Sequence, residues 1–446
     1  MKPSRHLATV SLILPASLLA ACSPSSDATA SDPAAQDPGV AVATQEDDPA
    51  AGPHVNAVTE ALTGFDGLPN GNCTADVFRE AGLTFREVEA FEDGIGPVFN
   101  NTSCVSCHES PRGTAEAQED NTNTKVFGGT ASQITELRAG HFNGLTFVNH
   151  PGGSLINDRA NDRSIQEHIL SGNEVQTLRL TISLAGDGYV EAINSNTLLA
   201  IANAQPAAQR GTLIQVPVLE AAGQNRTGRF GWKNQHSSLL SFASDAYINE
   251  MGVTNRFAQT ENTSNGTVVQ GGAFDGKADP AGTGEDDAGD IDAFTTFMRC
   301  LKAPPRGPQN SSTANGQIQF NNAGCAVCHV GTITTAAAGT VINGGALTVS
   351  TALGDKNIHP FSDFLLHDVG TGDGIVQNGG QGTRNQVRTA ALWGIGARTR
   401  FMHDGASLTV TAAIQRHGNQ AAAAKNAFNA LSATNQTDLV NFIFSL

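Results

Sequence analysis

The stretch Phe99–Pro111, FNNTSCVSCHESP, contains two cysteines separated by two residues, with a histidine directly after the second cysteine. Cys104, Cys107 and His108 are the residues that attachment of a c-type haem needs, because the thiols bond to the porphyrin and the imidazole ligates the iron. The same arrangement returns in Asn321–Val330, NNAGCAVCHV. Two copies predict two covalently attached haems.

In the second copy, Cys325 and Cys328 are the predicted attachment points and His329 is the predicted iron ligand. A four-cysteine zinc site, built from the two cysteine pairs, is the alternative. Such a site would leave both histidines without a role.

The N-terminus has the pattern of an export signal. Met1–Ala21 begins with Lys2 and Arg5, continues with an apolar stretch and ends in small residues. The sequence Leu19-Ala20-Ala21-Cys22 resembles a bacterial lipobox, which predicts a lipid on Cys22 and a periplasm-facing protein anchored to the membrane. An ordinary secretory signal is the alternative. We find no other apolar run near the ~18 residues of a transmembrane helix.

Composition divides the rest of the chain. Residues 22–60 are rich in Ser, Ala, Asp and Pro and are expected to form a disordered tether. We predict an N-terminal haem domain over 61–255, a Gly- and Asp-rich connection over 256–289, and a C-terminal haem domain over 290–446.

Hydrophobic spacing predicts helices in most of the regular segments. The predicted helices are Thr84–Glu92, Arg163–Leu170, Gly188–Ala202, Ser237–Glu250, Ile291–Leu301, Ser407–Arg416 and Ala433–Leu446. Leu178–Leu184 alternates apolar and polar residues and is predicted as a strand, whereas Thr114–Asp162 is predicted as long loops.

An acidic cluster precedes one of these helices. We expect Glu285, Asp286, Asp287 and Asp290 to cap the helix that starts at Ile291, because carboxylates stabilise a helix N-terminus. A cation site is the alternative.

The remaining cysteines and the net charge bear on the chemistry. Cys73 and Cys300 are left over, and in an oxidising compartment they are expected to form a structural disulfide. A redox-active or unpaired state is the alternative. The net charge of −16 argues against nucleic acid as a partner and fits attraction to a cationic electron carrier.

From about residue 80 to the C-terminus, the chain resembles the bacterial di-haem cytochrome c peroxidase superfamily. Within it, the chain is most similar to the di-haem oxidoreductases sometimes labelled thiol oxidoreductases. The segments that carry this resemblance are GIGPVFNNTSCVSCH, GRFGWK, EMG, LLHDVG, VRTAALWG and FMHDGAS. The resemblance implies a mainly α fold with two cytochrome-c-like domains, each holding one haem.

The implied enzyme reduces hydrogen peroxide, or uses it to oxidise another molecule. Its implied electron donor is a small redox protein of the cytochrome c or cupredoxin type. Calcium is a further candidate cofactor. The alternatives are a non-catalytic, membrane-tethered electron relay and a di-haem oxygenase that acts with dioxygen. Only Cys73 and Cys300 remain to support thiol chemistry.

In the peroxidases, a tryptophan between the haems precedes a catalytic glutamate in an EMG motif. The resemblance therefore implies that Trp232 bridges the haems and that Glu250 moves a proton between the peroxide oxygens. Glu191 is the second candidate for this acid. The glutamine that partners the acid in the peroxidases has no clear match in this chain near residues 240–242.

The second haem of the peroxidases is ligated by a methionine fourteen residues after the histidine of an HDG motif. The same distance from His403 falls on His417, the implied iron ligand here, and a surface residue at a helix end is the alternative. An iron with two histidine ligands has a lower potential than one with a histidine and a methionine. The resemblance also implies that His403 supports the haem pocket and that Arg388 pairs with a haem propionate.

The first haem departs from the peroxidase pattern, which places a displaceable histidine about sixteen residues after the proximal one. The next histidine after His108 is His141. Either His141, His150 or His168 reaches the iron, or the site is open from the start. We expect an open site that needs no reductive activation.

Overall fold

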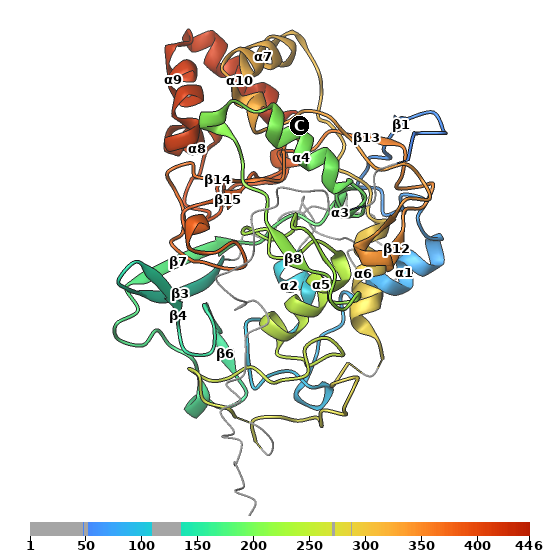
Figure 1. The fold of residues 1–446 in the computed structure, drawn as a ribbon, viewed down its shortest axis with the longest axis vertical. Coiled ribbons are helices and arrows are strands. Elements are labelled where there is room, and N and C mark those ends of the chain that lie inside the picture. The colour runs from blue at the N-terminus through green and yellow to red at the C-terminus, as the bar shows by residue number, and fades with distance from the viewer. Residues whose placement is uncertain (1–47, 49–51, 109–134, 270–272, 287) are drawn as a thin grey trace, which may run out of the picture.

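The computed structural model of the chain describes residue 48 and residues 52–108, 135–269, 273–286 and 288–446 (Figure 1). The predicted signal peptide, the proposed lipid site at Cys22 and Asp287 lie outside these residues. Within them, every helix is too short or too polar to cross a bilayer.

The predicted tether, residues 22–60, is described at Asp48 and from residue 52 onward, and there it contacts the folded body. The Asp48 carboxylate forms a buried ion pair of 2.8 Å with Arg226. Thr59–Glu60 forms strand β1, which pairs in parallel with β13, Lys356–Ile358. The folded part therefore begins earlier than the polar composition indicates.

The helices are mostly short. Those in the described residues are α1 Ala75–Thr84, α2 Cys104–Cys107, α3 Asp187–Glu191, α4 Ser195–Ala204, α5 Leu239–Ala246, α6 Asp290–Cys300, α7 Ser311–Asn322, α8 Val410–Arg416, α9 Ala422–Ala430 and α10 Ala433–Phe444.

Several small sheets accompany them. The further strands described are β2 Val98–Phe99, β3 Thr135–Asn143, β4 Thr146–Asn149, β5 Leu155–Ile156, β6 Arg159–Ala160, β7 Val175–Leu180, β8 Gln215–Pro217, β9 Asn225–Thr227, β10 Ile333–Thr334, β11 Val341–Ile342, β12 Leu347–Thr348, β14 Leu366–His367 and β15 Val387–Arg388.

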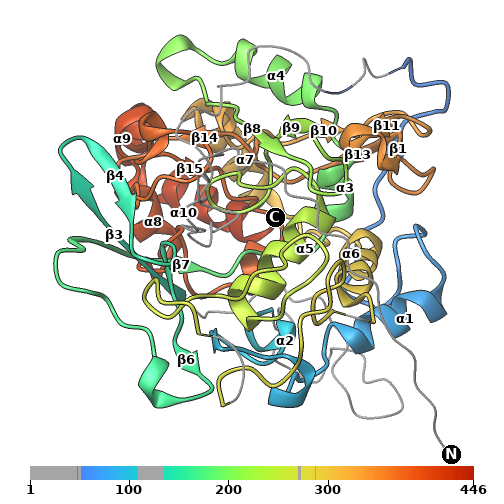
Figure 2. The ribbon, with the colours of Figure 1, turned by 60° about the horizontal axis from the view of Figure 1, so that its bottom comes forward.

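The prediction of a mainly α fold is wrong. Helices hold 32% of the described residues and strands hold 16%. The largest sheet is built around β3, which pairs antiparallel with β4, β5 and β7. The β3–β4 hairpin projects from the body of the molecule (Figure 2).

The β3–β4 hairpin also corrects the expectation of long loops over Thr114–Asp162, of which residues 114–134 lie outside the described part. Asn143 pairs with Thr146, so the connection is a two-residue turn. Gly144 opens this turn with a φ of +62°, which glycine adopts without steric cost.

The predicted helix Thr84–Glu92 is wrong in its position. Helix α1 begins after Thr74, whose hydroxyl accepts a hydrogen bond from the Val77 amide. It ends at Thr84, the residue at which the predicted helix was expected to begin. Phe85 is buried against Phe294 and Phe297, whereas Val88 is exposed. The helical spacing of these apolar residues therefore reflects no helix.

Other predicted elements are present with changed bounds. Gly188–Ala202 is split into α3 and α4 because Asn194 caps a new helix start. Arg163–Leu170 contains one 3₁₀ turn, Arg163–Ile165. The helices predicted at residues 237–250, 291–301, 407–416 and 433–446 are confirmed as α5 with a following π-helical turn, α6, α8 and α10.

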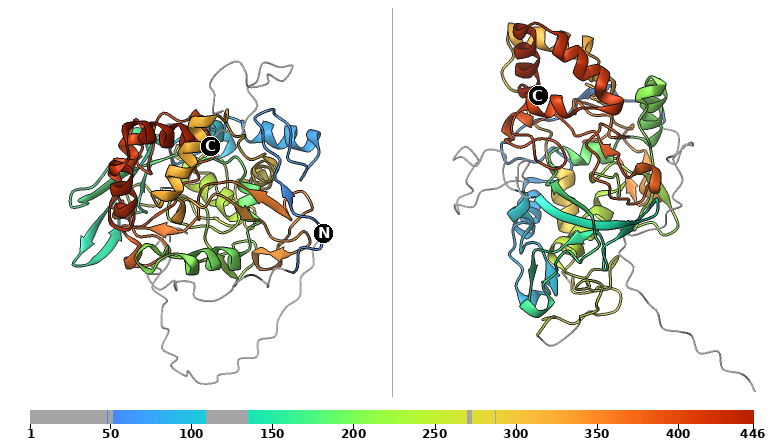
Figure 3. Two further views of the ribbon diagram at one scale, coloured as in Figure 1. Left: turned by 90° about the horizontal axis from the view of Figure 1, so that it is seen from above. Right: turned by 90° about the vertical axis from the view of Figure 1, so that its left-hand side faces the viewer.

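The largest buried cluster mixes residues from both predicted haem domains. Phe78 of α1 stacks on Phe297 of α6 with ring centroids 5.1 Å apart, and the same cluster includes Ile333 and Trp393. A second cluster lies where α7 packs on α10, around Phe320 and Phe442 (5.3 Å). The helices α7–α10 gather at one end of the long axis (Figures 1 and 3).

Helix α6 was expected to open the C-terminal haem domain, but it packs against α1, α3 and α5. Asp286 caps it, because its carboxylate accepts a hydrogen bond of 2.6 Å from the Asp290 amide. The expected disulfide between Cys73 and Cys300 is present and joins the last residue of α6 to the segment before α1. The division at residues 256–289 therefore remains an interpretation, and α6 lies with the N-terminal elements.

Candidate functional site

The first cysteine motif forms the wall of a cavity of about 590 Å³. Cys104 and Cys107 begin and end α2, and the His108 amide closes the turn by donating to the Cys104 carbonyl (2.9 Å). The cavity is further lined by β3, β7 and the C-terminal part of α5. A short helix, cysteines and an adjoining histidine thus face one apolar space large enough for a cofactor.

His108 is held neutral at this wall. Burial lowers its pKa to about 4, and the nearby Ile182 carbonyl opposes that shift. A neutral imidazole is the form that ligates a metal.

The second cysteine motif lines a separate cavity of about 210 Å³. The four cysteines therefore do not converge on one ion, and the zinc alternative is wrong. His329 Nδ1 lies 2.9 Å from the Phe361 carbonyl oxygen, which leaves Nε2 as the atom available for a ligand. Burial lowers the pKa of His329 to about 4.

His417 lines the same cavity as His329. Its Nδ1 lies 2.8 Å from the Ala413 carbonyl oxygen, so again Nε2 is available. This is the arrangement that an iron-ligating histidine would have, and it fits poorly with a free surface residue. His403 also lines this cavity and is buried.

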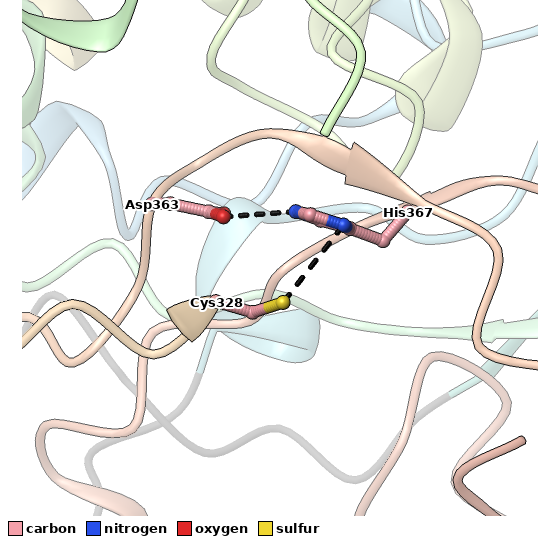
Figure 4. A group of neighbouring side chains, drawn as sticks. All are labelled: Cys328, Asp363 and His367. Carbon is pink, nitrogen blue, oxygen red and sulfur yellow. Dashed lines mark hydrogen bonds and ion pairs between the residues drawn. The ribbon is translucent and has the colours of Figure 1, made fainter. Parts of the chain in front are cut away.

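Cys328 has two polar neighbours, His367 and Asp363, to which the sequence analysis assigned no role (Figure 4). His367 Nδ1 lies 3.8 Å from the Cys328 sulfur, and its Nε2 lies 2.8 Å from an Asp363 carboxylate oxygen. Burial alone would lower the pKa of His367, but Asp363 and Cys328 raise it to about 10. These three residues could hold a metal ion. Because Cys328 belongs to the haem motif, we assign the His367–Asp363 pair to the haem pocket.

A single wall separates the two cavities. The residues that line both are Leu180, Ile182, Asp187, Trp232 and Arg388. The Trp232 indole nitrogen donates to the Leu180 carbonyl (2.7 Å), and the ring lies edge-on to His403 with centroids 6.2 Å apart. The structure thus brings Trp232 between the two motifs.

Arg388 and Asp187 are the ionisable residues of this wall. Arg388 Nε donates to the Gly231 carbonyl (3.0 Å), and burial lowers the pKa of Arg388 to about 10. Burial raises the pKa of Asp187 to about 7, although the Arg388 charge opposes that shift. Because Arg388 lines both cavities, it could form an ion pair with a propionate bound in either one.

Glu250 lies on the first cavity, on the π-helical turn after α5. The turn that carries Glu250 ends at Gly252, which has a φ of +79°. A side chain at this position would clash, because its Cβ would lie 2.4 Å from the Gly96 carbonyl oxygen. Asn100 Nδ2 donates to Glu250 Oε2 at 2.6 Å. The segment that carries the first motif therefore also positions this carboxyl group.

A second carboxylate, Glu136 on β3, faces Glu250 in the same cavity and shares a hydrogen bond with it. Burial, the Glu136 charge and this hydrogen bond raise the pKa of Glu250 well above its ordinary value. Burial would also raise the pKa of Glu136, but the Arg138 guanidinium, 2.6 Å away, holds it below its usual range. The pKa values of the two carboxyl groups are therefore moved apart, and Glu250 is the one that binds a proton more readily.

Glu191, the second candidate for the acid, lies elsewhere. It is fully buried and accepts hydrogen bonds from Arg299 (2.6 and 2.9 Å), the Leu239 amide (2.9 Å) and Asn343 (3.0 Å). Glu191 is a structural residue that joins α3, α5 and α6, and it lines neither cavity in the described part of the chain.

The three candidate histidines for the first haem differ in position. His168 lines the first cavity. His141 lies on β3, and His150 follows β4 and is buried, with ring nitrogens that have no hydrogen-bond partner among the described residues. Of these three, His168 is the one that the cavity could accommodate as a ligand.

Comparison with known proteins places the chain among haem enzymes. A family model described as "Di-haem oxidoreductase, putative peroxidase" matches residues 149–446, which include the second motif but not the first. No curated protein matches the chain significantly.

The solved structures similar to this chain include the following two. One is hydrazine synthase of Kuenenia stuttgartiensis, with 14% identity over 91% of this chain and 99% of that one and a TM-score of 0.37. The other is the diheme peroxidase BthA from Burkholderia thailandensis, with 12% identity over 90% and 94% and a TM-score of 0.40.

Proposed function

Because this chain belongs to the di-haem oxidoreductase family and is therefore an oxidoreductase with two haems, we propose that it reduces hydrogen peroxide with electrons passed between them. Oxidation of another molecule by peroxide would use the same site. The observation that carries the proposal is the Glu136–Glu250 pair on the wall of the cavity that contains His108.

The chain's residues fit two covalently attached c-type haems, because each motif lines its own cavity and each motif histidine is half-buried with a pKa lowered to about 4. When bound, the haems supply an iron that takes the peroxide and a store for electrons. The residues that would hold them are Cys104, Cys107 and His108 in the first cavity and Cys325, Cys328, His329 and His417 in the second.

Peroxide reduction consumes two electrons and two protons and releases two water molecules. One proton must move from the inner to the outer peroxide oxygen, so the site needs a group that accepts and returns it. Within the Glu136–Glu250 pair the proton favours Glu250, whose Oε2 accepts a hydrogen bond of 2.6 Å from Asn100 Nδ2. We assign this transfer to Glu250, with Glu136 as the partner that tunes its proton affinity.

The second haem is the proposed electron store. His417 and His329 both offer Nε2 to the second cavity, which would give its iron two protein ligands and a low potential. Trp232, in the shared wall, is the proposed bridge, and Arg388 is the proposed propionate partner.

The partners and location are also proposals. The net charge of −16 supports a cationic donor of the cytochrome c or cupredoxin type. The N-terminal sequence supports export and a lipid on Cys22, which would hold the enzyme at the periplasmic face of a membrane.

The test uses the chain exported in cells that assemble c-type cytochromes. We expect mass spectrometry to find two thioether-linked haems, and we expect reduced cytochrome c to be oxidised only when peroxide is added. An open first site should give a high-spin component in the oxidised EPR spectrum. Two low-spin haems that bind neither cyanide nor peroxide would indicate a relay, and turnover with dioxygen alone would indicate an oxygenase; either result contradicts the proposal.

A further inference from the structure

Three carboxylates converge in the connection between α5 and α6. The side chains of Glu261, Asp275 and Asp279 place one oxygen each within 4.8 Å of one another. They lie away from both haem cavities, whose linings do not include them among the described residues.

Glu261 is the unusual member of this cluster. Its side chain is buried, with 3% of the residue exposed, and no N–H or O–H group of the described residues donates a hydrogen bond to either carboxylate oxygen. Glu285 is also buried, at 1% exposed, and its Oε1 likewise has no such donor. Burying an ionised carboxylate without a partner is costly, so native proteins pair such groups or use them to bind metals.

The electrostatics of the cluster agree with this geometry. Burial, and then the charges of Glu285, Asp279 and Asp275, raise the pKa of Glu261 to about 10. A cation placed among these oxygens would remove that repulsion.

We propose that Glu261, Asp275 and Asp279, with Glu285 beside them, bind one Ca²⁺ ion. All candidate ligands are oxygens, which hard cations prefer, and oxygens that each lie 2.3–2.6 Å from one Ca²⁺ are at most roughly 5 Å apart. The two unpartnered oxygens of Glu261 allow bidentate binding, which the small octahedral shell of Mg²⁺ accepts poorly.

A bound ion would stabilise the position of the segment that carries Glu250. Thr254 donates its amide to Glu285 Oε2 (3.0 Å) and its hydroxyl to Asp279 Oδ1 (2.5 Å). Asn262, next to Glu261, donates to the Ile248 carbonyl of the π-helical turn at 2.6 Å. The bound ion would therefore join the connection to the turn beside the first cavity.

The test measures metal binding and melting on the holo-protein after EDTA treatment, without any activity assay, so its outcome is independent of the proposed function. We expect CaCl₂ to release heat on titration, with Kd on the order of 10⁻⁴ M or tighter. We also expect it to raise Tm by several degrees. MgCl₂ should bind at least tenfold more weakly.

Two variants locate the ion. Glu261→Gln and Asp275→Asn should each weaken Ca²⁺ binding at least tenfold. Because Glu261→Gln removes a buried repulsion, its metal-free Tm should equal or exceed that of the wild type, which separates lost binding from misfolding. The control is Asp76→Asn, which removes an exposed carboxylate paired with Arg79 and should keep the full Ca²⁺ response. No binding by the wild type, an unchanged response in Glu261→Gln, or equal binding of Mg²⁺ would overturn the proposal.

Discussion

Glu136 and Glu250 share a hydrogen bond at the edge of the first cavity, although more than a hundred residues separate them in the sequence. Arg138 holds Glu136 ionised, and Asn100 holds Glu250 in place. Two carboxyl groups so close cannot both ionise easily, so a proton shared by the pair favours Glu250, whose pKa is raised, over Glu136, whose pKa is lowered.

Glu250→Gln should lower peroxide turnover by about 10²- to 10⁴-fold, the usual contribution of a positioned acid or base. Both haems should remain attached, because Glu250 lies outside the two motifs. The measurement is steady-state oxidation of reduced cytochrome c. Glu80→Gln on the exposed face of α1 is the matched control and should keep full activity. Comparable rates in the two variants would show that Glu250 is not the acid.

Glu136→Gln should shift the pH dependence of turnover and should affect the maximal turnover rate less. Burial raises the pKa of Glu250, and the Glu136 charge raises it further. Removing that charge lowers the pKa of Glu250, so the limb of the kcat/KM profile that Glu250 controls should move to lower pH. A limb that stays in place, or moves to higher pH, would contradict the coupling between the two carboxyl groups.

His417→Met should raise the reduction potential of the second haem, because a thioether in place of an imidazole favours ferrous iron. Axial ligands tune haem potentials over about 0.8 V, so the shift should be easily resolved in a spectroelectrochemical titration. His359→Ala is the control, since His359 is exposed and pairs with Glu60. An unchanged potential in His417→Met would remove His417 from the iron.

Trp232→Phe should slow electron transfer between the haems and lower peroxide turnover at least several-fold. The change keeps an aromatic ring but removes the indole that donates to the Leu180 carbonyl. The chain contains one other tryptophan, Trp393, which lines only the second of the two cavities, so Trp393→Phe is the matched control. Stopped-flow reduction of each haem separates transfer from binding. Equal effects of the two substitutions would argue for simple packing.

The cofactor residues could be predicted because their chemistry depends on local spacing. Cys104, Cys107 and His108 are adjacent in the sequence, and the structure places them on one wall. The long apolar face of α10 was recognisable for the same reason, and its residues Leu439 and Phe442 are buried. The disulfide could be expected from the cysteine count together with the predicted export to an oxidising compartment.

The rest depends on pairing between distant segments. Glu136 belongs to no motif, and it reaches Glu250 because β3 pairs with β7 along the first cavity. Strand β1 pairs with β13, which lies almost three hundred residues further along the chain, and no local sequence pattern predicts this pairing. The β3–β4 hairpin is different, because a glycine such as Gly144 at the first position of a two-residue turn between two strand-like runs is a signal that could have been recognised.

The bond between Cys73 and Cys300 closes half of the polypeptide into a covalent ring. The first haem motif lies on the ring, whereas the second lies on the linear tail that leaves it. A protease that nicks the ring once would produce two fragments that still migrate together on a non-reducing gel and separate only after thiol treatment. Hydrolysis of any one peptide bond within the ring would therefore leave the two parts of the protein covalently linked.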